Sequence, residues 1–270
     1  MELKTLLMWA DHHAPLFFVF VLIVAAASGW FYWRRRGPWN AGAPVPMLRR
    51  SYGMVIAMVT SVVFAALAFA IEADGRLVAF DQNVTNEMHE NLGPAILNVL
   101  AIVTQFGGSH QLMIASAVIA VLLLLLRRWL LAAGFALSMI GNGLLIRIGK
   151  DYFQRVRPVN DHGPVIETGY SFPSGHAAGS MMFYGMLAYL LMVLTPARWH
   201  GVIIGVAIAV IALIGCSRVL LQVHFVSDVC AGYALAVGWG ALCVSAIEFL
   251  RTSRLPKPIE DALNYSKSEP

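Results

Sequence analysis

Long apolar stretches constrain this chain more than any other feature of its sequence. Seven stretches are close to the length that a helix needs to cross a bilayer, which is about 20 residues. They are Pro15–Trp33, Tyr52–Ile71, Gln111–Leu126, Trp129–Ile148, Ala177–Leu194, Gly201–Cys216 and Val229–Phe249. Because a spanning helix satisfies its own backbone hydrogen bonds, the pattern predicts a polytopic transmembrane helical bundle of the all-α class.

Composition excludes the main soluble classes. Hydrophobic residues make up 59% of the chain and charged residues 13%, whereas a typical soluble domain has about 45–50% and about 25%. These values exclude a disordered chain, a nucleic-acid-binding protein and a disulfide-stapled secreted domain as first interpretations. The three cysteines lie in apolar stretches and are predicted to be free thiols. We therefore expect membrane lipids as partners and no nucleic acid.

The chain divides into three regions. Residues 1–50 are predicted to hold an N-terminal transmembrane helix and a basic cytoplasmic loop, and residues 51–250 the main helical domain. Residues 251–270 form a polar tail that we expect to be disordered. Within the main domain, Val84–Phe106 is too polar at its start to span, so the sequence predicts one helix lying in the membrane interface.

The distribution of basic residues predicts the topology. If the N-terminus lies outside, the inner segments carry twelve basic residues, and the outer segments before the third span carry only Lys4 and Arg76. Basic residues concentrate on the cytoplasmic side of membrane proteins, so we expect a bacterial inner-membrane protein with this orientation. The remaining basic residues fall on the outer side and call for a functional reason; they are Arg147, Lys150, Arg155, Arg157 and Arg218.

Three short motifs are predicted to meet on that outer side. The first places Arg157-Pro158 seven residues after Lys150, and the second is Pro173-Ser174-Gly175-His176. The third contains Ser217, Arg218, His224 and Asp228. Even numbers of membrane crossings separate the motifs, so their side chains can converge.

The residue types in these motifs favour phosphoryl chemistry. Lys150, Arg157 and Arg218 can surround the charged oxygens of a phosphate. Ser174 is a candidate N-cap, which leaves the amides of Gly175 and His176 free for an anion. Because His224 and Asp228 are four residues apart, we expect them on one helical face, with the carboxylate orienting a nucleophilic imidazole. His176 remains as a general acid.

Together the motifs resemble those of the type 2 phosphatidic acid phosphatases, over roughly residues 52–249. The resemblance implies a six-helix core, to which the first helix is an addition, and a phosphatase that needs no metal or other cofactor. It implies that His224 carries a phosphohistidine, that Asp228 orients His224 and that His176 protonates the leaving group. The implied phosphate ligands are Lys150, Arg157, Ser174, Gly175 and Arg218.

Several alternatives stay open at this stage. A lipid phosphatase of the outer leaflet is favoured over an anion carrier, because ionisable residues gather at helix ends rather than at the bilayer midplane. A lipid-to-lipid phosphotransferase would use the same motifs. The substrate is a lipid phosphate or diphosphate: phosphatidate, phosphatidylglycerophosphate, undecaprenyl diphosphate or a lipid A phosphate. Arg155 and Arg147 are expected to act mainly in substrate capture, and Asn142 in an interhelical hydrogen bond.

Overall fold

The described part of the chain is helical throughout. In the computed structural model residues 50–73, 75–91, 93–159 and 164–253 are described, and they contain no strand. The helices are α3 (Arg50–Glu72), α4 (Arg76–Asn91), α5 (Pro94–Gln105), α6 (Ser109–Leu125), α7 (Trp129–Phe153), α8 (Gly175–Leu194), the short 3₁₀-helix η1 (Ala197–Trp199), α9 (His200–Leu220) and α10 (Val226–Thr252). The all-α class is confirmed.

Within the described residues, six helical segments are long and apolar enough to cross a membrane. They are Ser51–Glu72, Pro94–Leu125, Trp129–Phe153, Gly175–Leu194, Ala197–Leu220 and Val226–Thr252. Each overlaps one of the last six spans predicted from the sequence and contains it entirely, except that Gln111–Leu126 extends one residue past Leu125, so the six-helix core is confirmed. The predicted first span, 15–33, and residues 254–270 of the predicted tail lie outside the described residues.

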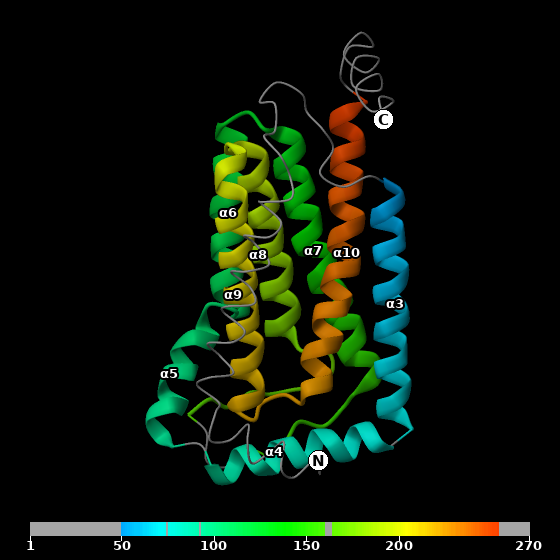
Figure 1. Cartoon of the computed structure of the whole chain (residues 1–270), viewed down its shortest axis with the longest axis vertical. Helices are drawn as coiled ribbons and strands as arrows, with labels where there is room; N and C mark the ends of the chain where they lie inside the picture. The colour runs from blue at the N-terminus through cyan, green and yellow to red at the C-terminus, as the bar shows by residue number, and fades with distance from the viewer. Residues whose placement is uncertain (1–49, 74, 92, 160–163, 254–270) are drawn as a thin grey trace.

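The segment between the predicted spans Tyr52–Ile71 and Gln111–Leu126 differs from the prediction. Instead of one interfacial helix over 84–106, the structure forms α4 and α5. The break falls at Gly93, which is extended (φ −72°, ψ 153°), and Pro94 opens α5. Proline fixes φ and lacks an amide hydrogen, so it begins a helix rather than continuing one. As a result α4 lies across one end of the bundle, while α5 packs against α9 (Figure 1).

Helix α3 packs against α10 through small residues. A Cβ atom at Gly53 would lie 1.8 Å from Ser245 Oγ, and one at Gly238 would lie 2.5 Å from Thr60 Oγ1. Neither position has room for a side chain, so the glycines permit the close approach of the two helices. Small residues of this kind are typical of interfaces between membrane helices. This contact holds α10, which carries part of the candidate site, beside α3.

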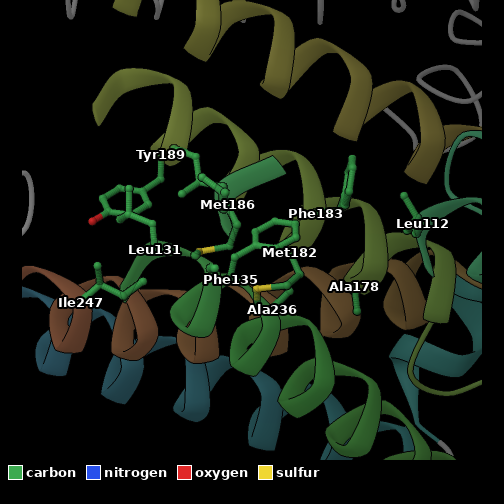
Figure 2. Packing of buried hydrophobic residues seen from close by; sticks show 13 residues of the cluster. Leu112, Leu131, Phe135, Ala178, Met182, Phe183, Met186, Tyr189, Ala236 and Ile247 are labelled. Carbon is green, nitrogen blue, oxygen red and sulfur yellow. The ribbon is translucent and has the colours of Figure 1, made fainter. Parts of the chain in front are cut away.

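The main apolar core lies between α7, α8 and α10. Phe135 of α7 is fully buried and lies among Met182 and Met186 of α8 (Figure 2). Its ring centroid is 6.2 Å from that of Phe183, in an edge-to-face arrangement. The flexible thioethers of methionine fill irregular gaps between helices. The core therefore sets the relative positions of three helices whose ends carry most of the candidate site.

The two ends of the bundle carry different parts of the sequence. Residues 154–159, residues 164–174 and the α9–α10 turn lie at the end that α4 covers (Figure 1). The α6–α7 turn, with Arg127 and Arg128, lies at the other end, as does η1. The structure thus separates the basic turns from the three motifs, as the predicted topology requires.

Candidate active site

The three sequence motifs meet at the end of the bundle that α4 covers. At this end α7 and α9 finish, and α8 and α10 begin (Figure 1). Backbone hydrogen bonds join the segments: Ser174 N donates to Asp228 O at 3.0 Å, and His224 N donates to Arg218 O at 3.2 Å. Residues from four helix ends therefore form one site.

A left-handed residue ends α7 and turns the chain toward this site. Gln154 has φ 46° and ψ 30°, and its amide donates to Lys150 O at 3.1 Å. A residue with a Cβ atom rarely adopts this conformation, so the turn is a specific feature of the loop. The next residues, Arg155 and Arg157, reach across to the α9–α10 turn and the start of α10.

The N-terminus of α8 has the cap that the sequence predicts. Ser174 is extended, and its Oγ accepts from Ala177 N at 3.4 Å. Gly175 and His176 open the helix, where backbone amides lack carbonyl partners in the preceding turn. A Cβ atom at Gly175 would come no closer than 3.8 Å to the heavy atoms around it. Neighbouring protein atoms therefore do not require glycine here, and its small size leaves space beside the free amides.

His224 is oriented by Asp228, but not along one helical face. His224 precedes α10, and Asp228 lies in the first turn of that helix. The prediction of a shared helical face is wrong, because α10 begins only at Val226. The contact forms across the turn instead: His224 Nδ1 lies 3.4 Å from Asp228 Oδ2, which also accepts from Phe225 N at 3.0 Å.

The surroundings of His224 determine which nitrogen carries its proton. Arg157 Nη1, which can only donate, lies 3.1 Å from His224 Nε2. Nε2 must therefore present its lone pair, and the proton lies on Nδ1, facing Asp228. Burial lowers the pKa of His224 to about 4, against the opposing effect of Asp228 and with a further lowering by Arg157 and Arg218. His224 thus presents a neutral imidazole whose Nε2 lone pair accepts a hydrogen bond from Arg157.

Arg218 is a fully buried cation with spare donor capacity. Its Nη1 donates to Thr104 Oγ1 at 2.7 Å, and its Nη2 pairs with Glu167 Oε1 at 2.5 Å. Its Nε has no hydrogen-bond partner among the described residues. An unpaired donor on a buried guanidinium is costly to leave unsatisfied, and it fits an anion bound in the site.

Lys150 and Arg157 are held by backbone carbonyls of the loop before α8. Lys150 Nζ donates to Tyr170 O, and Arg157 Nε donates to Gly169 O at 3.0 Å. Arg157 also donates to Val223 O at 2.7 Å, beside His224. The loop therefore positions two cations without cancelling their charge.

An apolar cavity of about 630 Å³ opens next to the site. It lies between α6, α7 and α8, and Lys150 and Gly175 of the candidate site are among the residues that line it. Most of the remaining wall is hydrophobic and includes Leu112 and Phe135. Asn142 also lines it and donates to Ala178 O at 3.3 Å, which confirms the predicted interhelical hydrogen bond.

A family model matches the part of the chain that carries the three motifs. The sequence model of the PAP2 superfamily matches residues 128–251, which include all three motifs. This segment is similar to proteins of the PAP2 superfamily. The PAP2 match therefore covers the ends of α7, α8, α9 and α10 that build the site.

Two solved structures and one sequence relative resemble this chain. A crystal structure described as a transmembrane PAP2-type phosphatidylglycerolphosphate phosphatase from Bacillus subtilis matches with a TM-score of 0.65 and 26% identity, over 75% of this chain and 98% of that chain. Phosphatidylglycerophosphatase B of Bacillus subtilis (strain 168) is 40% identical over 97 residues, or 35% of this chain. That match spans 47% of the relative, about half its length. LpxE of Aquifex aeolicus matches with a TM-score of 0.46 and 18% identity, over 65% of this chain and 96% of that chain.

One acidic residue of the candidate site, Glu167, has no role predicted from the sequence. Glu167 pairs with Arg218 at 2.5 Å, and its Oε1 lies 3.9 Å from His176 Nδ1. Burial alone would raise the pKa of Glu167, but Arg218 and His176 outweigh it and lower this pKa. Glu167 therefore stays ionised in the loop before α8 and occupies donors of Arg218 that an incoming anion would also use. Its position outside the three motifs left no sequence signal.

We expect Glu167→Gln to tighten the binding of inorganic phosphate about tenfold, because a charge-assisted hydrogen bond contributes about 1.5–3 kcal/mol and the competing carboxylate charge is removed. The measurement is the inhibition constant of inorganic phosphate. Asp151→Asn, which changes an exposed acid on α7, is the matched control and should leave that constant unchanged. Weaker phosphate binding in Glu167→Gln would show that the carboxylate supports the anion site instead of competing for it.

The structure also corrects the expectation for Arg155. Its side chain is only 9% exposed and pairs with both Asp81 and Asp228, so it does not face lipid headgroups or solvent. Arg147, in contrast, forms an exposed pair with Asp151, with 4.0 Å between Arg147 Nε and Asp151 Oδ2. Sequence spacing alone could not separate these two arginines, since Arg155 lies within the first motif and Arg147 lies just before it.

No group of three or more His, Cys, Asp and Glu side chains within the described ranges is arranged to hold a metal ion.

Ser171 is a further polar residue of the site. Its Oγ donates to Asp228 Oδ2 and lies 3.4 Å from His224 Nδ1. The carboxylate of Asp228 is thus shared between the imidazole and a buried hydroxyl.

Proposed function

We propose that this protein is an integral-membrane lipid phosphatase that works through a phosphohistidine and without a metal or other cofactor. The observation that carries the proposal is the neutral imidazole of His224, with its Nε2 lone pair facing Arg157 and its Nδ1 held by Asp228. A nucleophile oriented in this way beside several cations suits attack on a phosphate.

The proposed reaction has two steps. In the first, His224 Nε2 forms a bond to phosphorus, the bond to the lipid oxygen breaks, and His176 gives that oxygen a proton. In the second, water attacks the phosphohistidine, releases inorganic phosphate and restores His224, while His176 takes a proton from the water. The phosphoryl oxygens are bound by Lys150, Arg157, Ser174, Gly175 and Arg218, with the free Nε of Arg218 as one donor.

The proposed substrate is a glycerophospholipid phosphate of the phosphatidylglycerophosphate type. The apolar cavity beside Lys150 and Gly175 supports a lipid with a hydrocarbon chain next to its phosphate. Two relatives are named for the phosphatase reaction on phosphatidylglycerophosphate. Undecaprenyl diphosphate is the second substrate to test, because it also carries its phosphate groups on an apolar hydrocarbon chain.

A release assay tests the proposal. Purified protein in detergent is given phosphatidylglycerophosphate, phosphatidate, undecaprenyl diphosphate and a lipid A phosphate, each with EDTA present, and inorganic phosphate is measured. We expect release to be fastest from phosphatidylglycerophosphate and unaffected by EDTA. His224→Ala is the control for contaminating phosphatase. Because detergent solution holds no gradient, an anion carrier would release nothing, and a phosphotransferase would need an added acceptor lipid.

The pH dependence should reflect the low pKa of His224. The reacting form is the neutral imidazole, so activity falls as the pH drops through the pKa of His224 in the folded protein. Because that pKa is about 4 instead of the usual 6.5, we expect the acid limb of kcat/KM to lie well below pH 6.5. The measurement is a pH profile corrected for ionisation of the substrate phosphate. A corrected limb at 6.5 or above would contradict the assignment.

We further propose that the chain lies in the bacterial inner membrane with the site on the periplasmic side. The concentration of basic residues at the opposite end of the bundle supports this orientation. Single cysteines at exposed positions Val159 and Arg128, in a variant without the three native cysteines, should test it. In intact cells an impermeant thiol reagent should label position 159 and not position 128. The reverse labelling would overturn the orientation.

A further inference from the structure

Arg155 links the helix that covers the bundle end to the carboxylate beside His224. Its Nη2 lies 2.9 Å from Asp81 Oδ2 on α4, and its Nη1 lies 2.6 Å from Asp228 Oδ1 on α10. Both carboxylates are fully buried. The guanidinium therefore bridges two acids that come from elements far apart in the sequence.

Asp81 is built into this arrangement from the α4 side. It accepts from Ser227 N at 3.1 Å and from Ser227 Oγ, in addition to Arg155. Arg155 Nη1 also donates to Ser227 Oγ at 2.7 Å. A buried charge without partners is strongly destabilising. The buried side chains of Arg155, Asp81 and Ser227 pair with one another and so form a specific network.

The network reaches only one oxygen of Asp228. Oδ1 binds Arg155, while Oδ2 faces His224 and accepts from Ser171 and Phe225 N. A carboxylate that is held at both oxygens cannot rotate about its Cβ–Cγ bond without losing a charge-assisted hydrogen bond. The Arg155 guanidinium also stacks over the Phe225 ring, with its Cζ atom 4.2 Å from the ring centroid, directly beside His224 in the chain.

We propose that Arg155 and Asp81 are positioning residues: they hold the carboxylate of Asp228 in the rotation that orients His224, and they make that rotation depend on the docking of α4. The inference rests on the proposed function, in which His224 is the nucleophile. Neither Asp81 nor Arg155 needs to touch the substrate. Loss of either should therefore lower kcat and leave KM nearly unchanged.

A double-mutant cycle on phosphate release tests the pair. We expect Asp81→Asn and Arg155→Gln each to lower kcat about tenfold to a hundredfold, which is the effect of a small misplacement of reacting groups. The double variant should be no worse than the poorer single variant, because both changes break one network. Arg155→Lys keeps the charge but loses the planar fork, so it should rescue only in part.

The exposed pair Arg147 and Asp151 is the matched control, since it is also an arginine–aspartate pair next to the first motif. Arg147→Gln and Asp151→Asn should leave kcat unchanged. A rise in KM with normal kcat in Arg155→Gln would overturn the proposal in favour of substrate capture. Additive losses in the double variant would also overturn it.

A measurement without substrate separates this inference from the proposed function. The Nδ1 proton of His224 is expected to give a downfield resonance in proton NMR of the detergent-solubilised protein, and Asp228→Ala should abolish it. Asp81→Asn should shift this resonance upfield, and Asp151→Asn should not. An unchanged resonance in a folded Asp81→Asn protein would overturn the positioning role, whatever the activity proves to be. Failure of the wild type to release phosphate, with the resonance behaving as expected, would overturn only the proposed function.

Discussion

Alanine at position 224 is expected to abolish phosphate release from every substrate, whereas alanine at position 176 should do so selectively. His224 forms the covalent intermediate in the proposed mechanism, so no leaving group can bypass its loss. His176 only protonates the leaving oxygen, and the need for that proton depends on how basic the oxygen is. An alkyl lipid phosphate expels a basic alkoxide, while nitrophenyl phosphate expels a stable phenolate.

The measurement is kcat/KM of both variants on both substrates at one pH. For His176→Ala we expect a loss of about 10²–10⁴ on the lipid monophosphate, the usual contribution of general acid catalysis, and substantial recovery on the aryl phosphate. His224→Ala should stay inactive on both. Recovery of His224→Ala by the aryl phosphate would mean that nucleophile and acid are assigned the wrong way round.

Removal of the Arg218 guanidinium is expected to have the second-largest effect. Arg218→Ala should lower kcat/KM at least about a hundredfold, or about 3 kcal/mol, because in the proposed mechanism this fully buried guanidinium binds the phosphoryl group and its Nε has no other hydrogen-bond partner among the described residues. Arg157→Ala should show a comparable loss, since its guanidinium lies 3.1 Å from His224 Nε2. Lysine at position 218 should not restore activity, because it lacks the planar set of donors.

Arg147→Ala is the control for these variants. Its side chain is 83% exposed, and an exposed ion pair contributes little to stability. We expect at most a small rise in KM. An equal collapse of Arg147→Ala and Arg218→Ala, with normal expression of both proteins, would show that general charge at this end of the bundle matters more than the buried guanidinium.

The sequence alone determined the spans and the residues of the three motifs. The predicted span Trp129–Ile148 lies within α7, because the length of an apolar stretch is set by the thickness of the bilayer rather than by neighbouring helices. Residues as far apart in the chain as Lys150 and His224 could be placed at one end of the bundle by counting membrane crossings. The cap of Ser174 followed from local rules as well.

Only the tertiary structure decided which other groups join the site. Arg155 meets Asp81 across 74 residues, and Arg218 meets Glu167 across 51 residues. No periodicity or spacing encodes such contacts, because they depend on how α4 and the loop before α8 fold over the bundle end. For the same reason the sequence assigned Arg155 to substrate capture. Whether an arginine faces lipid headgroups or a buried carboxylate is determined by tertiary packing and not by the local sequence.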